Sequence, residues 1–163
     1  MTLKAPSPIE SSHDVSVFSC GHSSLDDWLR RRALANQKSG ASRTFVVCDE
    51  TRVVAYYALA AGALACAEAT GKFRRNMPDP IPVAILARLA IDVGFQKQGL
   101  GRALFRDASL RILGAADAIG IRGILVHAIS EEAANFYRAI GVESSPASPQ
   151  TLMMTLVDLQ SAL

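Results

Sequence analysis

The stretch VGFQKQGLGRALFRDA, residues 93–108, joins an apolar run to a long helical pattern. Gly99 and Gly101 stand at this junction, where the absence of Cβ atoms lets a ligand approach the backbone closely. The first amide groups of a helix have no partner inside it, and the helix dipole favours an anion there. Arg102 adds positive charge. The stretch therefore predicts an anion-binding turn between a strand and a helix, with a tight connection that binds nothing as the alternative.

The residues around the two glycines exclude the common nucleotide-binding loops. A P-loop requires G-x-x-x-x-G-K-[ST], but the only Gly-Lys pair in the chain is Gly71-Lys72, which is followed by Phe73. A dinucleotide fingerprint requires G-x-G-x-x-G, and Leu104 stands at the third glycine position. A diphosphate bound by another kind of loop is the ligand that still suits this turn.

Hydrophobic periodicity predicts an α/β fold in which a central mixed β-sheet is flanked by helices, with residues 1–163 forming a single domain. Ser23 or Ser24 is expected to cap the first helix, and Ser130 a late helix that ends at Gly141. The predicted elements, in order, are a helix at 23–39, two strands within 43–65 joined by a turn at Asp49–Arg52, a loop at 71–82, a central strand at 83–92, a helix after the glycines, a strand at Arg122–Ile129, a helix at 131–140 and a strand at 151–159.

The composition indicates a globular chain. It has 163 residues, 50% of them hydrophobic, and a mean hydropathy of +0.21, so there is ample material for a core. The longest apolar run, Val53–Ala67, is shorter than the roughly 20 residues that cross a bilayer, and no signal peptide is expected. Three cysteines without a C-x-x-C pair and three scattered histidines predict neither a disulfide framework nor a metal site. We expect a cytoplasmic protein without a membrane anchor.

Positive charge is concentrated in two places, although the net charge is only +2. The first cluster consists of Arg30, Arg31, Arg32, Lys38 and Arg43, with no acidic residue among them, and the second of Lys72, Arg74 and Arg75. Such clusters suit phosphates, and a solvated helix face is the alternative.

Two stretches carry a resemblance to a known family. The pattern Q-x-x-G-x-G in Gln96–Gly101, after the strand LARLAIDV, resembles motif A of the GCN5-related N-acetyltransferases (GNAT), and SEEAANFYRAIGV resembles their late helix. The resemblance implies that the diphosphate of acetyl-coenzyme A binds the loop and that its pantetheine arm pairs with the main chain of the preceding strand. Lys97 stands where many members have glycine. The cofactor-binding residues implied are Ile91, Val93, Gln98, Gly99, Leu100, Gly101, Arg102 and, with a helix surface as the alternative, Asn135.

The resemblance extends over nearly the whole chain to the GNAT toxins of toxin–antitoxin pairs, through FSCGHSSLDDWLRRRALANQKSGASRTFVVCD, ARLAID and the segments that follow. It implies an enzyme that acetylates the α-amine of aminoacyl-tRNA and so inhibits translation. It also implies a small ribbon–helix–helix antitoxin as partner, and a homodimer. The tRNA-binding residues then expected are Arg30, Arg31, Arg32, Lys38, Arg43, Arg74, Arg75 and Arg88.

The chemistry of acetyl transfer limits the residues that are needed. An α-amine has a pKa of about 7.7–8.0, so much of it is neutral at cellular pH and a strong base is optional. Tyr137 matches the family tyrosine that protonates the leaving thiolate, and Phe136 is the better candidate for the core because adjacent helical residues point about 100° apart. Tyr56 and Tyr57 are expected to lie in a strand and either to pack in the core or to form a pocket wall. Arg88, within an apolar strand, needs a buried carboxylate, which we favour, or an RNA phosphate.

Two other functions remain open at this point. The acceptor amine of the same family reaction is alternatively a protein N-terminus, a lysine or a small amine. The chain is alternatively a non-enzymatic coenzyme-binding or DNA-binding module, against which the presence of Tyr137 argues.

Overall fold

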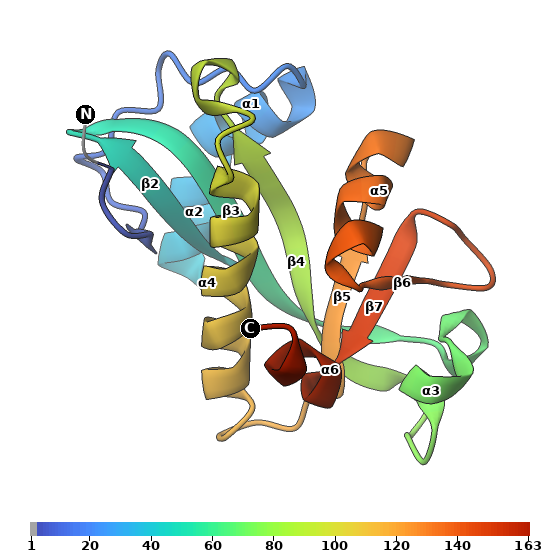
Figure 1. The fold of residues 1–163 in the computed structure, drawn as a ribbon. Helices are drawn as coiled ribbons and strands as arrows, with labels where there is room; N and C mark the ends of the chain where they lie inside the picture. The colour runs from blue at the N-terminus through green and yellow to red at the C-terminus, as the bar shows by residue number, and fades with distance from the viewer. Residues whose placement is uncertain (1–2) are drawn as a thin grey trace. The chain divides into compact units, whose positions relative to one another are not determined.

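The computed structural model describes residues 3–163. Seven strands have the order β1-β2-β3-β4-β5-β7-β6, with parallel and antiparallel neighbours, which confirms the predicted mixed α/β sheet with helices (Figure 1). The residues group into two compact units. Unit 1 contains the chain up to Ala60 together with Ala87–Ala108, and unit 2 contains Ala61–Leu86 together with Ser109–Leu163. Strands β3 and β4 and helix α4 each contribute residues to both units.

The hairpin β2–β3 forms the sheet portion of unit 1. Strand β2 (Arg43–Asp49) pairs antiparallel with β3 (Arg52–Leu64), and the short β1 (Ser7–Pro8) pairs with the other edge of β2. The chain turns at Glu50, whose φ of 57° is left-handed, so the predicted turn at Asp49–Arg52 is confirmed. Packed β-branched and aromatic side chains stabilise the strands, and the predicted packing role of the buried Tyr56 and Tyr57 is confirmed.

Two short helices of unit 1 replace the single helix expected at 23–39. Helices α1 (Ser23–Arg31) and α2 (Ala33–Ser39) are separated at Arg32, and α2 packs beside β2 (Figure 1). The predicted serine cap is wrong, because His22 occupies the N-cap position and makes no side-chain cap hydrogen bond. The carboxylate of Asp26 instead accepts a hydrogen bond from the amide of Cys20 at 2.9 Å. Gly40 ends α2 with a φ of 85°.

Unit 2 carries the other sheet neighbours. The first part of β4 (Ile81–Ile91) pairs in parallel with β5 (Gly123–His127), which pairs antiparallel with β7 (Thr151–Thr155), and β6 (Glu143–Ser144) follows at the edge. Several predicted boundaries are wrong here. Strand β4 begins at Ile81, inside the predicted loop at 71–82, because Ile81 is already a buried core residue. Residues 71–74 are not loop but the helical turn α3 (Gly71–Arg74), capped by Thr70. The last strand stops at Thr155, because that hydroxyl accepts the amide hydrogen of Asp158 and begins helix α6 (Leu156–Ser161).

Helix α5 (Glu131–Ile140) packs beside β6 and β7 (Figure 1). Both of its predicted ends are confirmed, since the Ser130 hydroxyl accepts the amide hydrogen of Ala133 and Gly141 terminates the helix with a φ of 110°. The choice between its two aromatic residues is wrong. Tyr137 is buried at 6% exposure together with Ala134 one turn earlier, whereas Phe136 is only partly buried. Residues three apart share a helix face, and that face is the buried one.

Candidate functional site

Asp92 organises the segment between β4 and the glycine loop. It is 4% exposed and lies directly before the short 3-10 turn η2 (Val93–Phe95). Its carboxylate accepts hydrogen bonds from the amides of Ser19 at 3.1 Å and Gly94 at 3.0 Å, and it pairs with the Arg52 guanidinium at 3.5 Å. Arg52 in turn lies over the Phe95 ring at 5.8 Å. A buried carboxylate with three donors fixes the path of the chain as it enters the loop.

Gln96, the first residue of the Q-x-x-G-x-G pattern, is a structural bridge. Its side-chain amide donates to the carbonyl oxygens of Cys20 at 3.0 Å and Ile91 at 2.8 Å. Lys97 and Gly99 follow with φ values of 62° and 81°, both left-handed. A lysine adopts that conformation at a cost of roughly 1–2 kcal/mol, which glycine avoids. The backbone at Lys97 therefore has the conformation that suits the glycine found there in many members of the family.

Helix α4 (Leu100–Ala115) begins one residue after Gly99, so the amides of Leu100, Gly101 and Arg102 lie in its first turn. The side chain of Arg102 is exposed, and a Cβ atom built on Gly99 would meet nothing within 4 Å. Within unit 1 the helix is tied to β3 by the Tyr57 hydroxyl, which donates to Asp107 at 2.5 Å. The first-turn amides of a helix have no partner inside that helix, so an accessible helix N-terminus beside an arginine fits the diphosphate of a coenzyme.

The two strand residues predicted to meet the pantetheine arm make main-chain contacts of their own. The carbonyl of Ile91 accepts from Gln96, and the amide of Val93 donates to the carbonyl of Ser19 at 2.8 Å. The Val93 side chain is 57% exposed. The Val93 amide hydrogen is therefore already bonded to the Ser19 carbonyl. A pantetheine arm that contacts Val93 would have to use its carbonyl or its side chain.

Tyr137, the predicted acid, lies on the buried face of α5 in unit 2. Burial raises the pKa of its hydroxyl well above the ordinary value of 10. The phenol therefore stays protonated throughout the physiological range, which is the state that a proton donor requires.

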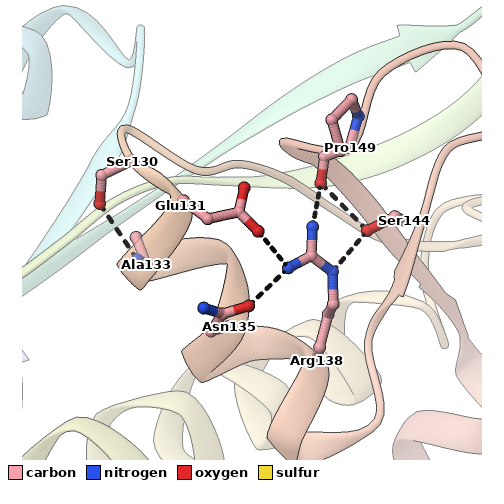
Figure 2. Close-up of polar contacts among 7 residues, drawn as sticks. All are labelled: Ser130, Glu131, Ala133, Asn135, Arg138, Ser144 and Pro149. Carbon is pink, nitrogen blue, oxygen red and sulfur yellow. Dashed lines mark hydrogen bonds and ion pairs between the residues drawn. The ribbon is translucent and has the colours of Figure 1, made fainter.

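Asn135 and Arg138 of the same helix form a polar cluster with residues on both sides of the guanidinium (Figure 2). The Asn135 side-chain oxygen accepts a hydrogen bond from Arg138 at 2.7 Å, so this oxygen is engaged within α5. Arg138 also donates to Glu131, to the Ser144 hydroxyl and to the Pro149 carbonyl. Asn135 itself is exposed, and its assignment to the coenzyme stays a prediction.

The predicted basic residues are distributed over both units. In unit 1, Arg30 donates to the Phe18 carbonyl at 2.8 Å and Arg43 to the Gln37 carbonyl at 2.8 Å, while both remain exposed. Three others are exposed and make no side-chain hydrogen bond or ion pair to any described residue: Arg31, Arg32 and Lys38. In unit 2, Arg74 donates to the Ala69 carbonyl at 3.3 Å, and Arg75 is exposed.

The preferred interpretation of Arg88 is wrong. Within residues 3–163 no carboxylate lies within ion-pair distance of its guanidinium. The guanidinium instead lies over the Trp28 ring, with 4.4 Å between its central carbon and the ring centroid. An aromatic face supplies electrostatic attraction without an acid, and so lets a half-buried arginine stay in a strand.

The sequence analysis did not predict the structural roles of two residues, Asp92 and Arg138. Asp92 had a local signal, because an Asp two residues before Gly94 is a typical side-chain cap of a turn. For Arg138 the sequence indicates only the contacts within the helix, to Glu131 and Asn135, because its other partners, Ser144 and Pro149, lie beyond the end of the helix. Across the described part of the chain there is no group of three metal-ligating side chains, and no helix is long and apolar enough to span a bilayer.

Comparison with known proteins is consistent with this geometry. Residues 40–143 match the model of the acetyltransferase (GNAT) domain. The tRNA-acetylating toxin of Mycobacterium tuberculosis is 52% identical over 159 residues, which cover 98% of this chain and 96% of the relative.

Solved structures of the toxin AtaT are similar over nearly their full length. AtaT complexed with acetyl-methionyl-tRNAfMet is 25% identical with a TM-score of 0.89, and 98% of each chain is covered. A tyrosine-to-phenylalanine variant of AtaT bound to the C-terminus of the antitoxin AtaR is 25% identical with a TM-score of 0.84, and AtaTR bound with acetyl-CoA is 26% identical with a TM-score of 0.83. Each covers 98% of this chain, and 96% of the solved chain is matched.

Proposed function

Because this chain belongs to the GNAT acetyltransferase family, we propose that it transfers acetyl from acetyl-CoA to the α-amine of aminoacyl-tRNA and acts as a translation-inhibiting toxin. The observation that carries the proposal is the 52% identity, over 98% of the chain, to a tRNA-acetylating toxin. The matched region covers nearly the whole chain, so it spans the loop, the tyrosine helix and the basic segments.

The coenzyme is assigned to the loop of unit 1. The first-turn amides of α4 and the exposed Arg102 are the groups that would hold its diphosphate, with Gln98, Gly99, Leu100 and Gly101 forming the turn. Asp92 and Gln96 are assigned to hold the loop in shape, because both connect it to the main chain of unit 1.

Tyr137 is assigned as the general acid. The neutral α-amine nitrogen attacks the thioester carbonyl, the carbon–sulfur bond breaks, and the phenol proton passes to the leaving thiolate. The attacking nitrogen gives its extra proton to water, and the Tyr137 phenolate regains a proton from water after the coenzyme thiol has formed. No strong base is needed, because much of the α-amine is already neutral at cellular pH. Burial keeps the Tyr137 hydroxyl protonated before the reaction, which is the state in which it can donate.

The acceptor and partners complete the proposal. The exposed arginines and lysine at 30–43 are assigned to the phosphates of tRNA, since they have few competing carboxylates. A small antitoxin of the ribbon–helix–helix class is the proposed neutralising partner, supported by the complex of AtaT with AtaR. A homodimer in the cytoplasm is the proposed form.

The decisive experiment is mass spectrometry of the acceptor. The purified protein is incubated with acetyl-CoA, a mixture of aminoacyl-tRNAs and, in parallel, a tRNA-free protein extract. Nuclease digestion should release aminoacyl-adenosine that is heavier by one acetyl group, and the protein extract should remain unmodified. Acetylation of protein lysines or N-termini alone would contradict the proposed acceptor, and no transfer to any amine would contradict the enzymatic function.

A further inference from the structure

Arg138 holds helix α5 to the segment that follows it. Its Nη1 donates to Glu131 at 3.0 Å and to Asn135 at 2.7 Å, both on α5 itself. Its Nε donates to the Ser144 hydroxyl at 2.9 Å, and its Nη2 to the Pro149 carbonyl at 2.9 Å. Figure 2 shows the planar guanidinium among these four acceptors, with the helix on one side and the β6–β7 segment on the other.

The acceptors on the two sides constrain different motions. Glu131 and Asn135 lie seven and three residues before Arg138, so they fix the guanidinium to the preceding turns of α5. Ser144 and Pro149 lie outside the helix, and the Ser144 hydroxyl itself donates to the Pro149 carbonyl at 3.0 Å. A planar group bonded on both sides resists rotation of α5 about its own axis, because rotation would break the outer bonds.

Tyr137 is the residue whose position depends most on that rotation. It precedes Arg138 directly and lies on the buried face, about 100° around the helix from the guanidinium side chain. Gly141 ends the helix one turn later, and the Val142 amide returns to the Tyr137 carbonyl at 3.0 Å. Arg138 thus attaches α5 to the segment that follows it through two side-chain hydrogen bonds, one to Ser144 and one to Pro149.

We propose that Arg138 is the positioning residue for Tyr137: its four-acceptor contact sets the rotation of α5 and hence the direction of the phenol hydroxyl. This inference rests on the proposed function for its kinetic consequence, but not for the contact itself. Lysine cannot replace the arginine, because an ammonium group does not have the flat fork of five donors that reaches acceptors on two sides.

The test combines kinetics with a spectroscopic signal of Tyr137. The chain has three tyrosines, so ring-labelled [13C]tyrosine gives three resonances, and Tyr137→Phe assigns one of them. Arg138→Lys is expected to lower kcat about 100-fold with little change in the KM for acetyl-CoA, and to shift the Tyr137 resonance alone. Ser144→Ala, which removes one acceptor, is expected to produce a smaller effect of the same kind.

Thr155→Val is the matched control. It removes the N-cap of α6 in the same unit without changing the side-chain shape, and should lower the melting temperature without affecting kcat or the Tyr137 resonance. Wild-type kcat in Arg138→Lys, or a loss of kcat with an unmoved Tyr137 resonance, would overturn the inference. If the wild-type protein acetylates no tRNA, the proposed function fails, whereas the resonance still tests whether Arg138 sets the position of Tyr137.

Discussion

The guanidinium carbon of Arg88 lies 4.4 Å from the centroid of the Trp28 ring, and that ring stacks on Tyr56 with 5.9 Å between centroids. The arginine therefore sits on an aromatic layer, and burial lowers its pKa without an acid beside it. The cation is stabilised by the ring face, and its N–H groups remain available to an anionic ligand.

Replacing Arg88 by methionine tests this arrangement. Trp28 is the only tryptophan, so the intrinsic fluorescence reports on the stack directly. Arg88→Met should change the emission intensity, lower stability by about 0.5–1 kcal/mol and raise the KM for aminoacyl-tRNA. Arg106→Met, at an exposed position of α4, should leave the emission unchanged. Unchanged emission in the Arg88 variant would contradict the stacking.

Asp92 is expected to matter for both stability and coenzyme affinity. The two carboxylate oxygens of Asp92 each accept a hydrogen bond from a backbone N–H group. Asp92→Asn replaces one of these oxygens by an NH2 group, which cannot accept, so it should lower the free energy of unfolding by about 1–3 kcal/mol. The loop then loses its fixed entry, and calorimetry should show weaker binding of acetyl-CoA. Asp117→Asn, at an exposed position, should change neither quantity measurably. Unchanged affinity for acetyl-CoA in Asp92→Asn would show that this carboxylate does not support coenzyme binding.

Tyr137→Phe should retain acetyl-CoA binding and lose about 10²- to 10⁴-fold in kcat, because only the proton donor is removed. The pH profile gives a second measurement. In the wild type, kcat/KM should rise as the acceptor amine loses its proton, near or below about 8, and then stay level beyond pH 10. It stays level because burial raises the pKa of Tyr137 above its ordinary value, so the donor keeps its proton there. Full turnover in the phenylalanine variant would remove Tyr137 from the mechanism.

The three exposed residues Arg31, Arg32 and Lys38 should act through charge. Changing all three to alanine should raise the KM for aminoacyl-tRNA and leave the KM for acetyl-CoA unchanged. If each contacts a phosphate, the slope of log affinity against log salt should decrease by roughly 0.7–0.9 per residue removed. Lys4→Ala, which removes an exposed positive charge elsewhere in unit 1, should not alter the slope. An unchanged slope in the triple variant would place the tRNA on another surface.

Two glycines should respond to alanine in opposite directions. A Cβ on Gly123 would overlap the carbonyl oxygen of Met154, so Gly123→Ala forces strand β5 away from β7 and should cost roughly 3 kcal/mol or more. A Cβ on Gly114 meets nothing within 4 Å, and Gly114→Ala should add about 0.5–1 kcal/mol to helix α4. Urea unfolding of both variants measures the difference. Equal stabilities would contradict the close approach at Gly123.

Local signals explain the part of the fold that the sequence predicted well. The hairpin of β2 and β3, the Ser130 cap and the terminating glycines at Gly40 and Gly141 each depend on residues within a few positions of one another. The predicted end of the last strand was wrong because the local pattern there is misleading. Leu156–Leu159 is apolar enough to continue a strand. Only the hydrogen bond from the Asp158 amide to the Thr155 hydroxyl shows that a helix begins there.

The sequence by itself determined the mixed sheet, the glycine turn before α4 and the tyrosine on a late helix, because hydrophobic period, capping and glycine conformation act over short distances. Only the tertiary structure decided which side chains support those features. Asp92 meets an amide 73 residues away, and Arg88 meets the face of Trp28. Tyr137, rather than Phe136, is buried because packing against the sheet selects one face of an amphipathic helix, and periodicity alone leaves neighbouring faces nearly equivalent.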